Sequence, residues 1–172
     1  MPLSLVSLGL ALLSTTGPQD GALTRSARTA SYTINARLDP AAHTVTGEVR
    51  IDWLNPSRLP ARTLELHAYL NAFKNDTTRF ATEGRHSAGF GLPDHPRWGG
   101  LDVTDVQVMG APVTALTWKD DGTVLSITPA RPVSGRGQVS ITAQFVARLP
   151  EVIARSGYAG DFHLVGQWFP KL

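Results

Sequence analysis

Residues 44–53, TVTGEVRIDW, show the alternation that decides the fold class of this chain. Apolar and polar side chains alternate along the stretch, and this period of two places them on opposite faces of a β-strand. A helix would mix the two kinds of residue on every face. The apolar positions are Val45, Val49, Ile51 and Trp53. The stretch therefore predicts a strand that buries one face in a core.

A second alternating stretch, YTINARL, comes just before it at residues 32–38. Residues 39–43, DPAAH, separate the two stretches. Asp and Pro both favour turns, because Asp bonds to nearby backbone and Pro presets φ. The two stretches are therefore predicted to pair as an antiparallel hairpin.

The rest of the chain repeats this pattern in short pieces. Residues 119–122, KDDG, predict a hairpin turn in which the Asp-Gly pair supplies positive φ. Residues 71–100 show no periodicity and predict a long irregular loop, and no stretch predicts a helix of three or more turns. The chain is predicted to be all-β, an antiparallel sandwich or saddle-like curved sheet of about seven or more strands. The further alternating stretches are 63–70, 101–109, 113–118, 123–128 and 139–145.

The composition suits one packed domain rather than a disordered chain. Hydrophobic residues make up 42% of the 172 residues, and charged residues make up 17%. The net charge is only +2 and no run of five or six basic residues occurs, so we expect no nucleic-acid partner. Cysteine is absent, which excludes disulfides, thiolate catalysis and metal sites with cysteine ligands.

Residues 1–29 are predicted to be a signal-like leader followed by a linker. Residues 3–13, LSLVSLGLALL, have the length of a signal-peptide hydrophobic region and are too short to span a bilayer as a helix. Small and polar residues follow, but no Lys or Arg precedes the apolar run. We expect an exported protein that is periplasmic, secreted or anchored to the membrane by this leader. The alternative is a buried strand or a short apolar helix.

No residue pattern typical of an active site is present. None of the histidines belongs to a His-Glu-x-x-His motif, the helical zinc-binding pattern. His86 and His95 lie near Glu83 and Asp94 in the sequence, but histidines in polar loops usually face solvent. Ser156 lacks the Gly-x-Ser-x-Gly context of a nucleophile. We expect no catalytic residue, metal ligand or cofactor in this chain. The five histidines are His43, His67, His86, His95 and His163.

Two groups of motifs resemble a known family. Residues 32–56 combine a strand, Leu-Asp-Pro at 38–40, Thr-x-x-Gly-Glu at 44–48 and Asn-Pro at 55–56. Residues 145–171 contain Arg-Leu-Pro at 148–150 and the more specific Gln-Trp-Phe-Pro-Lys at 167–171. Over about residues 30–172, the chain resembles the amino-terminal domain of bacterial proteins in peptidase family M1, the gluzincin zinc aminopeptidases.

The resemblance implies that residues 30–172 are a saddle-shaped β-domain that covers a thermolysin-like catalytic domain. In that family the zinc ligands and the general-base glutamate belong to the later domain. Zinc and peptidase activity are therefore expected there, and this chain is expected to be inactive alone. The implied partners are the catalytic domain of the same protein and a peptide substrate. Because the chain stops within an aromatic segment, we expect it to be truncated before the catalytic domain.

Gln167 matches the glutamine with which the family binds the free α-amino group of the substrate. A Gln carbonyl oxygen suits this role because it can accept a hydrogen bond from an ammonium. Many family members have an acidic or amide side chain two residues later, where this chain has Phe169. The alternative role of Gln167 is to cap a strand end at the domain interface. Trp168 and Phe169 are expected to be exposed, which would make the isolated domain poorly soluble.

A second functional hypothesis belongs to a different class. The chain would be a free-standing, secreted β-sandwich module that binds a protein or carbohydrate through loop 71–100 without catalysis. A third, that the chain is itself a hydrolase, has no supporting residues. A His-Glu-x-x-His motif in the downstream reading frame would favour the first hypothesis over the second.

Overall fold

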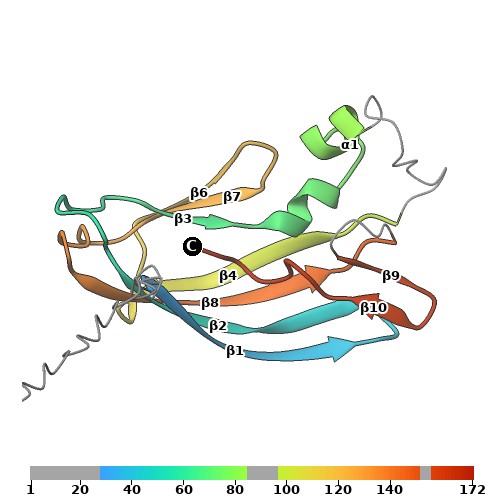
Figure 1. Ribbon diagram of the computed structural model, residues 1–172, viewed down its shortest axis with the longest axis horizontal. Coiled ribbons are helices and arrows are strands. Elements are labelled where there is room, and N and C mark those ends of the chain that lie inside the picture. The colour runs from blue at the N-terminus through green and yellow to red at the C-terminus, as the bar shows by residue number, and fades with distance from the viewer. Residues whose placement is uncertain (1–27, 85–96, 152–155) are drawn as a thin grey trace, which may run out of the picture.

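The structure, a computed structural model, describes residues 28–84, 97–151 and 156–172. It is an all-β fold in which two antiparallel sheets face each other, with a small hairpin beside them (Figure 1). The predicted antiparallel all-β fold is confirmed. Nearly all of the predicted leader and linker, 1–29, lies outside the described residues. The described strands are β1 (Ala30–Asp39), β2 (Thr44–Leu54), β3 (Leu64–His67), β4 (Gly100–Val108), β5 (Ala111–Pro112), β6 (Ala115–Lys119), β7 (Val124–Thr128), β8 (Gln138–Arg148), β9 (Gly157–Ala159) and β10 (Phe162–Leu164).

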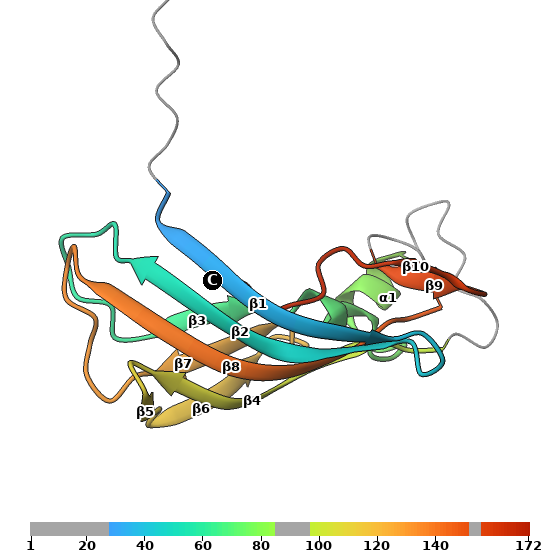
Figure 2. The same cartoon turned by 90° about the horizontal axis from the view of Figure 1, so that it is seen from below.

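The larger sheet has five strands in the order β1-β2-β8-β4-β5. β1 and β2 form the predicted hairpin, with Ala30 opposite Trp53 and Asp39 opposite Thr44. β8 occupies the centre and pairs with β2 on one side and β4 on the other. The long strands of this sheet curve together, with the smaller sheet behind them in the view of Figure 2.

Burial in this sheet follows the alternation predicted from residues 44–53. Val49 and Ile51 are buried, whereas Arg50 between them is exposed. Ile51 lies directly opposite Ile141 of β8, and both side chains are completely inaccessible to solvent. Because β-branched side chains pack well on a pleated surface, these pairs stabilise the centre of the sheet.

The smaller sheet has the order β3-β7-β6, and it closes the other side of the core. The turn between β6 and β7 lies where it was predicted, and Gly122 of the Asp-Gly pair has positive φ, but the other positive φ belongs to Asp120 and not to Asp121. The side chain of Asp121 makes a contact outside this turn. Its carboxylate accepts a hydrogen bond from the backbone N–H of Arg79 at 3.0 Å.

The strand predicted over residues 63–70 is shorter than expected. β3 ends at His67, and a 3-10 helix, η1 (Tyr69–Phe73), follows it. The alternation still predicted burial correctly, because Leu64, Leu66, Ala68 and Leu70 are all buried. The predicted irregular loop 71–100 contains the end of η1 and a short helix, α1 (Arg79–Gly84), and its residues 85–96 lie outside the described part.

One buried side chain explains why the backbone leaves the strand after β3. Asn71 donates hydrogen bonds to the carbonyl oxygens of Leu101 and Gly122, at 3.1 and 2.8 Å. Its own side-chain oxygen accepts the N–H of Leu101 at 2.7 Å. These bonds join η1 to β4 and to the β6–β7 turn. They satisfy backbone groups that would otherwise be buried without partners.

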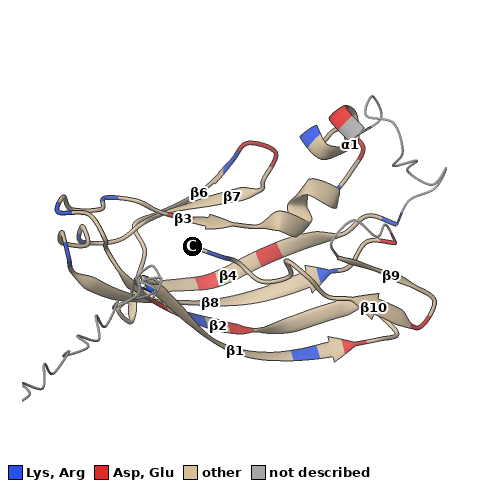
Figure 3. Cartoon of the chain, in the orientation of Figure 1, with Lys and Arg blue, Asp and Glu red and all other residues tan. Residues whose placement is uncertain are grey.

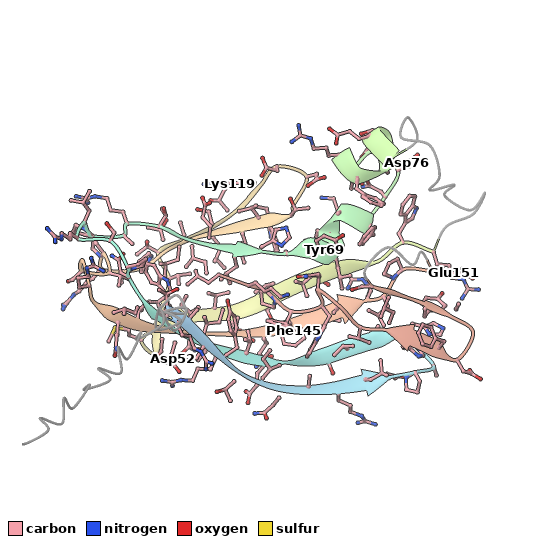
Figure 4. The ribbon with its side chains drawn as sticks, in the orientation of Figure 1. Asp52, Tyr69, Asp76, Lys119, Phe145 and Glu151 are labelled. Atoms are coloured by element: carbon pink, nitrogen blue, oxygen red, sulfur yellow. The ribbon has the colours of Figure 1, made fainter. Side chains whose placement is uncertain are left out.

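Charged residues of both signs are interspersed over the two sheets (Figure 3). The described ion pairs are largely exposed, such as the pair between Glu65 and Lys119, of which Figure 4 labels Lys119. Such pairs add little stability because solvent screens them. Within the described ranges, no helix has the length and apolar character needed to cross a membrane.

Candidate functional site

The segment that contains Gln167 lies between the two sheets. We call residues 165–172 the terminal segment, drawn in red in Figure 1. The backbone of Lys171 exchanges two hydrogen bonds with His67 of β3, at 2.6 and 3.1 Å. On the other side, the Tyr32 hydroxyl of β1 bonds to both the carbonyl oxygen and the N–H of Leu172, at 3.2 and 3.1 Å. The terminal segment therefore joins an edge strand of each sheet.

Gln167 takes part in a small cluster that holds a primary ammonium. Its side-chain oxygen accepts a hydrogen bond from the Lys171 ammonium at 2.5 Å. The same ammonium lies 4.8 Å from the centroid of the Phe169 ring, a distance at which the ring face attracts a cation. All three side chains are half-buried. We call Gln167, Phe169 and Lys171 the ammonium cluster.

The expected exposure of Trp168 and Phe169 is wrong. Both residues are half-buried and pack against the core. Trp168 makes an edge-to-face contact with Phe145 of β8, which Figure 4 labels, at a centroid distance of 5.6 Å, and Phe169 makes one with Tyr32 at 5.7 Å. The terminal segment folds back onto its own domain, so these rings do not form the exposed patch on which the low solubility was predicted.

His67 and Ser156, two other residues considered from the sequence, do not take part in the ammonium cluster. His86 and His95, with Asp94, lie outside the described residues, so the metal site considered for them has no structural description. His67 is exposed on β3, and its backbone, not its ring, bonds to Lys171. Ser156 is completely buried, so its hydroxyl cannot meet a substrate.

A polar cluster on the outer face of the large sheet was missed by the sequence analysis. The Arg50 guanidinium bonds to the Asp52 carboxylate at 2.9 Å and to the Ser140 hydroxyl at 2.8 Å, and Ser140 in turn donates to Asp52. The hydrogen bond from Arg50 holds the pKa of Asp52 below its usual range. A carboxylate with a lowered pKa is a poor general base, so this cluster does not activate the serine. Asp52 and Ser140 are cross-strand neighbours, a pairing that requires the register to be known.

The zinc implied by the family resemblance has no ligand set in the described part of the chain. A catalytic zinc takes three protein ligands, and the described residues contain no group of three or more His, Asp or Glu placed to hold a metal ion. Neither a protein-family model nor a curated protein sequence matches this chain. Its function must therefore be inferred from its own residues.

Proposed function

We propose that residues 30–172 form the amino-terminal β-domain of an M1-type zinc aminopeptidase and help to bind the α-amino group of a peptide substrate. The observation that carries this proposal is the hydrogen bond between the Gln167 side-chain oxygen and a primary ammonium, that of Lys171. A peptide N-terminus offers the same chemical group. Catalysis would belong to a separate catalytic domain of the same protein, which would also hold the zinc.

The ammonium cluster suits amine recognition for two reasons. The Gln167 oxygen accepts a charge-assisted hydrogen bond, and the Phe169 ring face adds attraction for the cation without a formal negative charge. Phe169 stands where many family members carry an acidic or amide group, so the ring would replace that polar contact. A peptide amine would have to displace Lys171, whose long flexible side chain can turn toward solvent.

An exposed apolar surface near the terminal segment supports a contact with a further domain. Phe162 and Leu164 of β10 are 61% and 38% exposed. Both side chains are large and apolar, and two such residues on one short strand favour burial against a partner. In this proposal they contact the catalytic domain of the same protein.

The first test examines the reading frame downstream of residue 172. A His-Glu-x-x-His motif followed by a Glu about twenty residues later would support the proposal. The absence of this motif over several hundred codons would contradict it. In parallel, the purified chain with added zinc should not hydrolyse aminoacyl chromogenic substrates, and turnover that chelation abolishes would show that the chain is itself an enzyme.

A second test addresses Gln167 directly. A short peptide with a free N-terminus should shift the NMR signal of the Gln167 side-chain amide, and the same peptide with an acetylated N-terminus should not. Replacing Lys171 with Met (Lys171→Met) removes the competing ammonium and should strengthen the response to the free peptide. Equal responses to both peptides would show that Gln167 does not recognise an amine.

The alternative is a free-standing binding module without catalysis. It is favoured by a hollow of about 590 Å³ between the end of β4 and the turn at residues 129–133, beside the 73%-exposed Met109. Apolar side chains line much of this hollow, as in many ligand sites. If the downstream frame lacks the zinc motif, binding of a ligand that protects Met109 from oxidation would support this alternative.

A further inference from the structure

Two histidines from distant parts of the chain meet beside the small hairpin. His43 belongs to the turn between β1 and β2, and His163 belongs to β10. The Nδ1 atom of His43 lies 2.9 Å from the Nε2 atom of His163. The two elements lie at the same end of the molecule in Figure 1. Both residues are half-buried, so the pair is partly accessible to solvent.

Hydrogen bonding defines the protonation of the pair. The Nδ1 atom of His163 lies 3.1 Å from the carbonyl oxygen of Asp161, which can only accept a hydrogen bond. Nδ1 of His163 therefore carries a proton, and its Nε2 presents a lone pair when the ring is neutral. A histidine that binds a metal through one nitrogen usually donates the other N–H to a carbonyl or carboxylate in this way.

The position of His43 is fixed from two directions. Its ring stacks on Tyr158 with a centroid distance of 3.5 Å and an interplanar angle of 5°. Its carbonyl oxygen accepts the N–H of Leu149 at 2.9 Å, and its backbone adopts a positive φ of 51°. Tyr158 is also the cross-strand partner of His163. The Tyr158 ring therefore stacks on His43 and lies 6.2 Å, centroid to centroid, from the ring of His163, an ordered arrangement that suits a binding site.

The separation of the two nitrogens matches that of neighbouring ligands on one metal ion. Zinc–nitrogen bonds are about 2.0–2.1 Å long, so two nitrogens at 90–109° around an ion lie about 2.8–3.4 Å apart. We propose that His43 Nδ1 and His163 Nε2 form a two-histidine site for a divalent transition-metal ion, Cu²⁺ or Zn²⁺. The ion replaces the proton that the rings share, and His43 then carries its proton on Nε2.

The chemistry of the site favours copper over zinc in affinity. Neutral imidazole is a good ligand for both ions, and Cu²⁺ binds a given nitrogen site more tightly than Zn²⁺. Within the described residues, no third His, Asp or Glu side chain joins the pair in a metal-binding group. Water would fill the remaining coordination positions. The site is separate from the ammonium cluster, so its test is independent of the proposed function.

The test is calorimetric titration of the full, tag-free chain with CuCl₂ and, separately, with ZnCl₂. We expect one ion of either metal per chain at this site. His43→Gln and His163→Gln should each weaken metal binding on the order of 10–100-fold. Loss of a residue that only hydrogen-bonds to a metal ligand commonly weakens metal affinity by that factor, so loss of the ligand should do at least as much. His67→Gln is the matched control for an exposed single histidine, and the double variant with His86→Gln and His95→Gln is the control for the loop histidines. Both controls should bind as tightly as the original chain.

A spectroscopic measurement on the original chain needs no variant, so it remains valid even if the Gln variants fail to fold. On addition of Zn²⁺, the NMR signals of His43 Nδ1 and His163 Nε2 should shift together, with smaller changes at His67. Binding that is lost only in the variant lacking His86 and His95, or that survives loss of both His43 and His163, would overturn the proposal. So would imidazole signals of His43 and His163 that do not respond to the ion.

Discussion

The five-stranded sheet and the irregular segments are both well packed, but different interactions hold them. In β2 and β8, the positions of apolar residues along each strand decide which side chains are buried. Single side chains instead hold η1 and the terminal segment in place, namely Asn71 within η1 and Tyr32 of β1, which bonds to Leu172. Regular structure therefore spreads its stability over many similar contacts, whereas irregular structure concentrates it in a few specific ones.

The largest effect is expected in the core of the sheet. Replacing Ile51 with Ala should lower the free energy of unfolding by about 2–5 kcal/mol, because the side chain is completely buried and leaves a cavity. Urea denaturation measures the change. Leu38→Ala is the matched control, since Leu38 is 40% exposed on the neighbouring strand, and it should cost less than about 0.5 kcal/mol. Similar losses in both variants would show that alternation does not determine stability here.

The next effect tests a single side chain outside the sheet pattern. Asn71→Ala should lower the free energy of unfolding by about 2–3 kcal/mol, because it removes three hydrogen bonds and leaves buried backbone groups without partners. The control is Asn35→Ala, whose side chain is exposed on β1 and bonds only to Glu48 among described side chains. If the two variants are equally stable, Asn71 does not hold η1 in place.

A smaller effect is expected where the terminal segment meets β1. Tyr32→Phe keeps the ring that contacts Phe169 but removes the hydroxyl that bonds twice to Leu172. We expect a loss of about 1 kcal/mol in the free energy of unfolding and faster hydrogen exchange at the Leu172 amide. The Ile51 amide in the sheet is the internal control. Unchanged exchange at Leu172 would show that other contacts hold the terminal segment.

The smallest effect concerns an ion pair on the surface of the sheet. Two hydrogen bonds from Arg148, at 2.5 and 3.1 Å, lower the pKa of Asp102. The ionised carboxylate therefore stabilises the fold above its unfolded pKa of about 3.9, and this contribution is lost as the pH falls through the lower folded pKa. Asp102→Asn should cost about 0.5 kcal/mol at pH 7, since both side chains are largely exposed.

The pH dependence of stability provides a control for the pair between Asp102 and Arg148. Between about pH 5 and pH 3, the original chain should lose more stability than Asp102→Asn, because only the original chain protonates Asp102. Denaturant midpoints across this range measure the difference. Parallel curves for the two proteins would show that the Arg148 contact does not contribute to folding.

The sequence predicted the sheet better than the sites, for a physical reason. Alternation is a local property, so the β1–β2 hairpin and the buried face of β8 follow from neighbouring residues. The contact between His43 and His163 spans 120 residues, and that between Tyr32 and Leu172 spans 140. No local pattern encodes such contacts. The burial of Trp168 was missed for the same reason, because its partner is Phe145 on β8.

The central position of β8 also sets an order of assembly during synthesis. β2 and β4 are both made before β8, which pairs with each of them. Until residue 148 leaves the ribosome, the edges of β2 and β4 that will pair with β8 remain unpaired, and exposed edges of this kind pair readily with other chains. Completion of β8 provides the partner for both of these edges. We therefore expect the nascent chain to be more prone to aggregation before β8 emerges than after it.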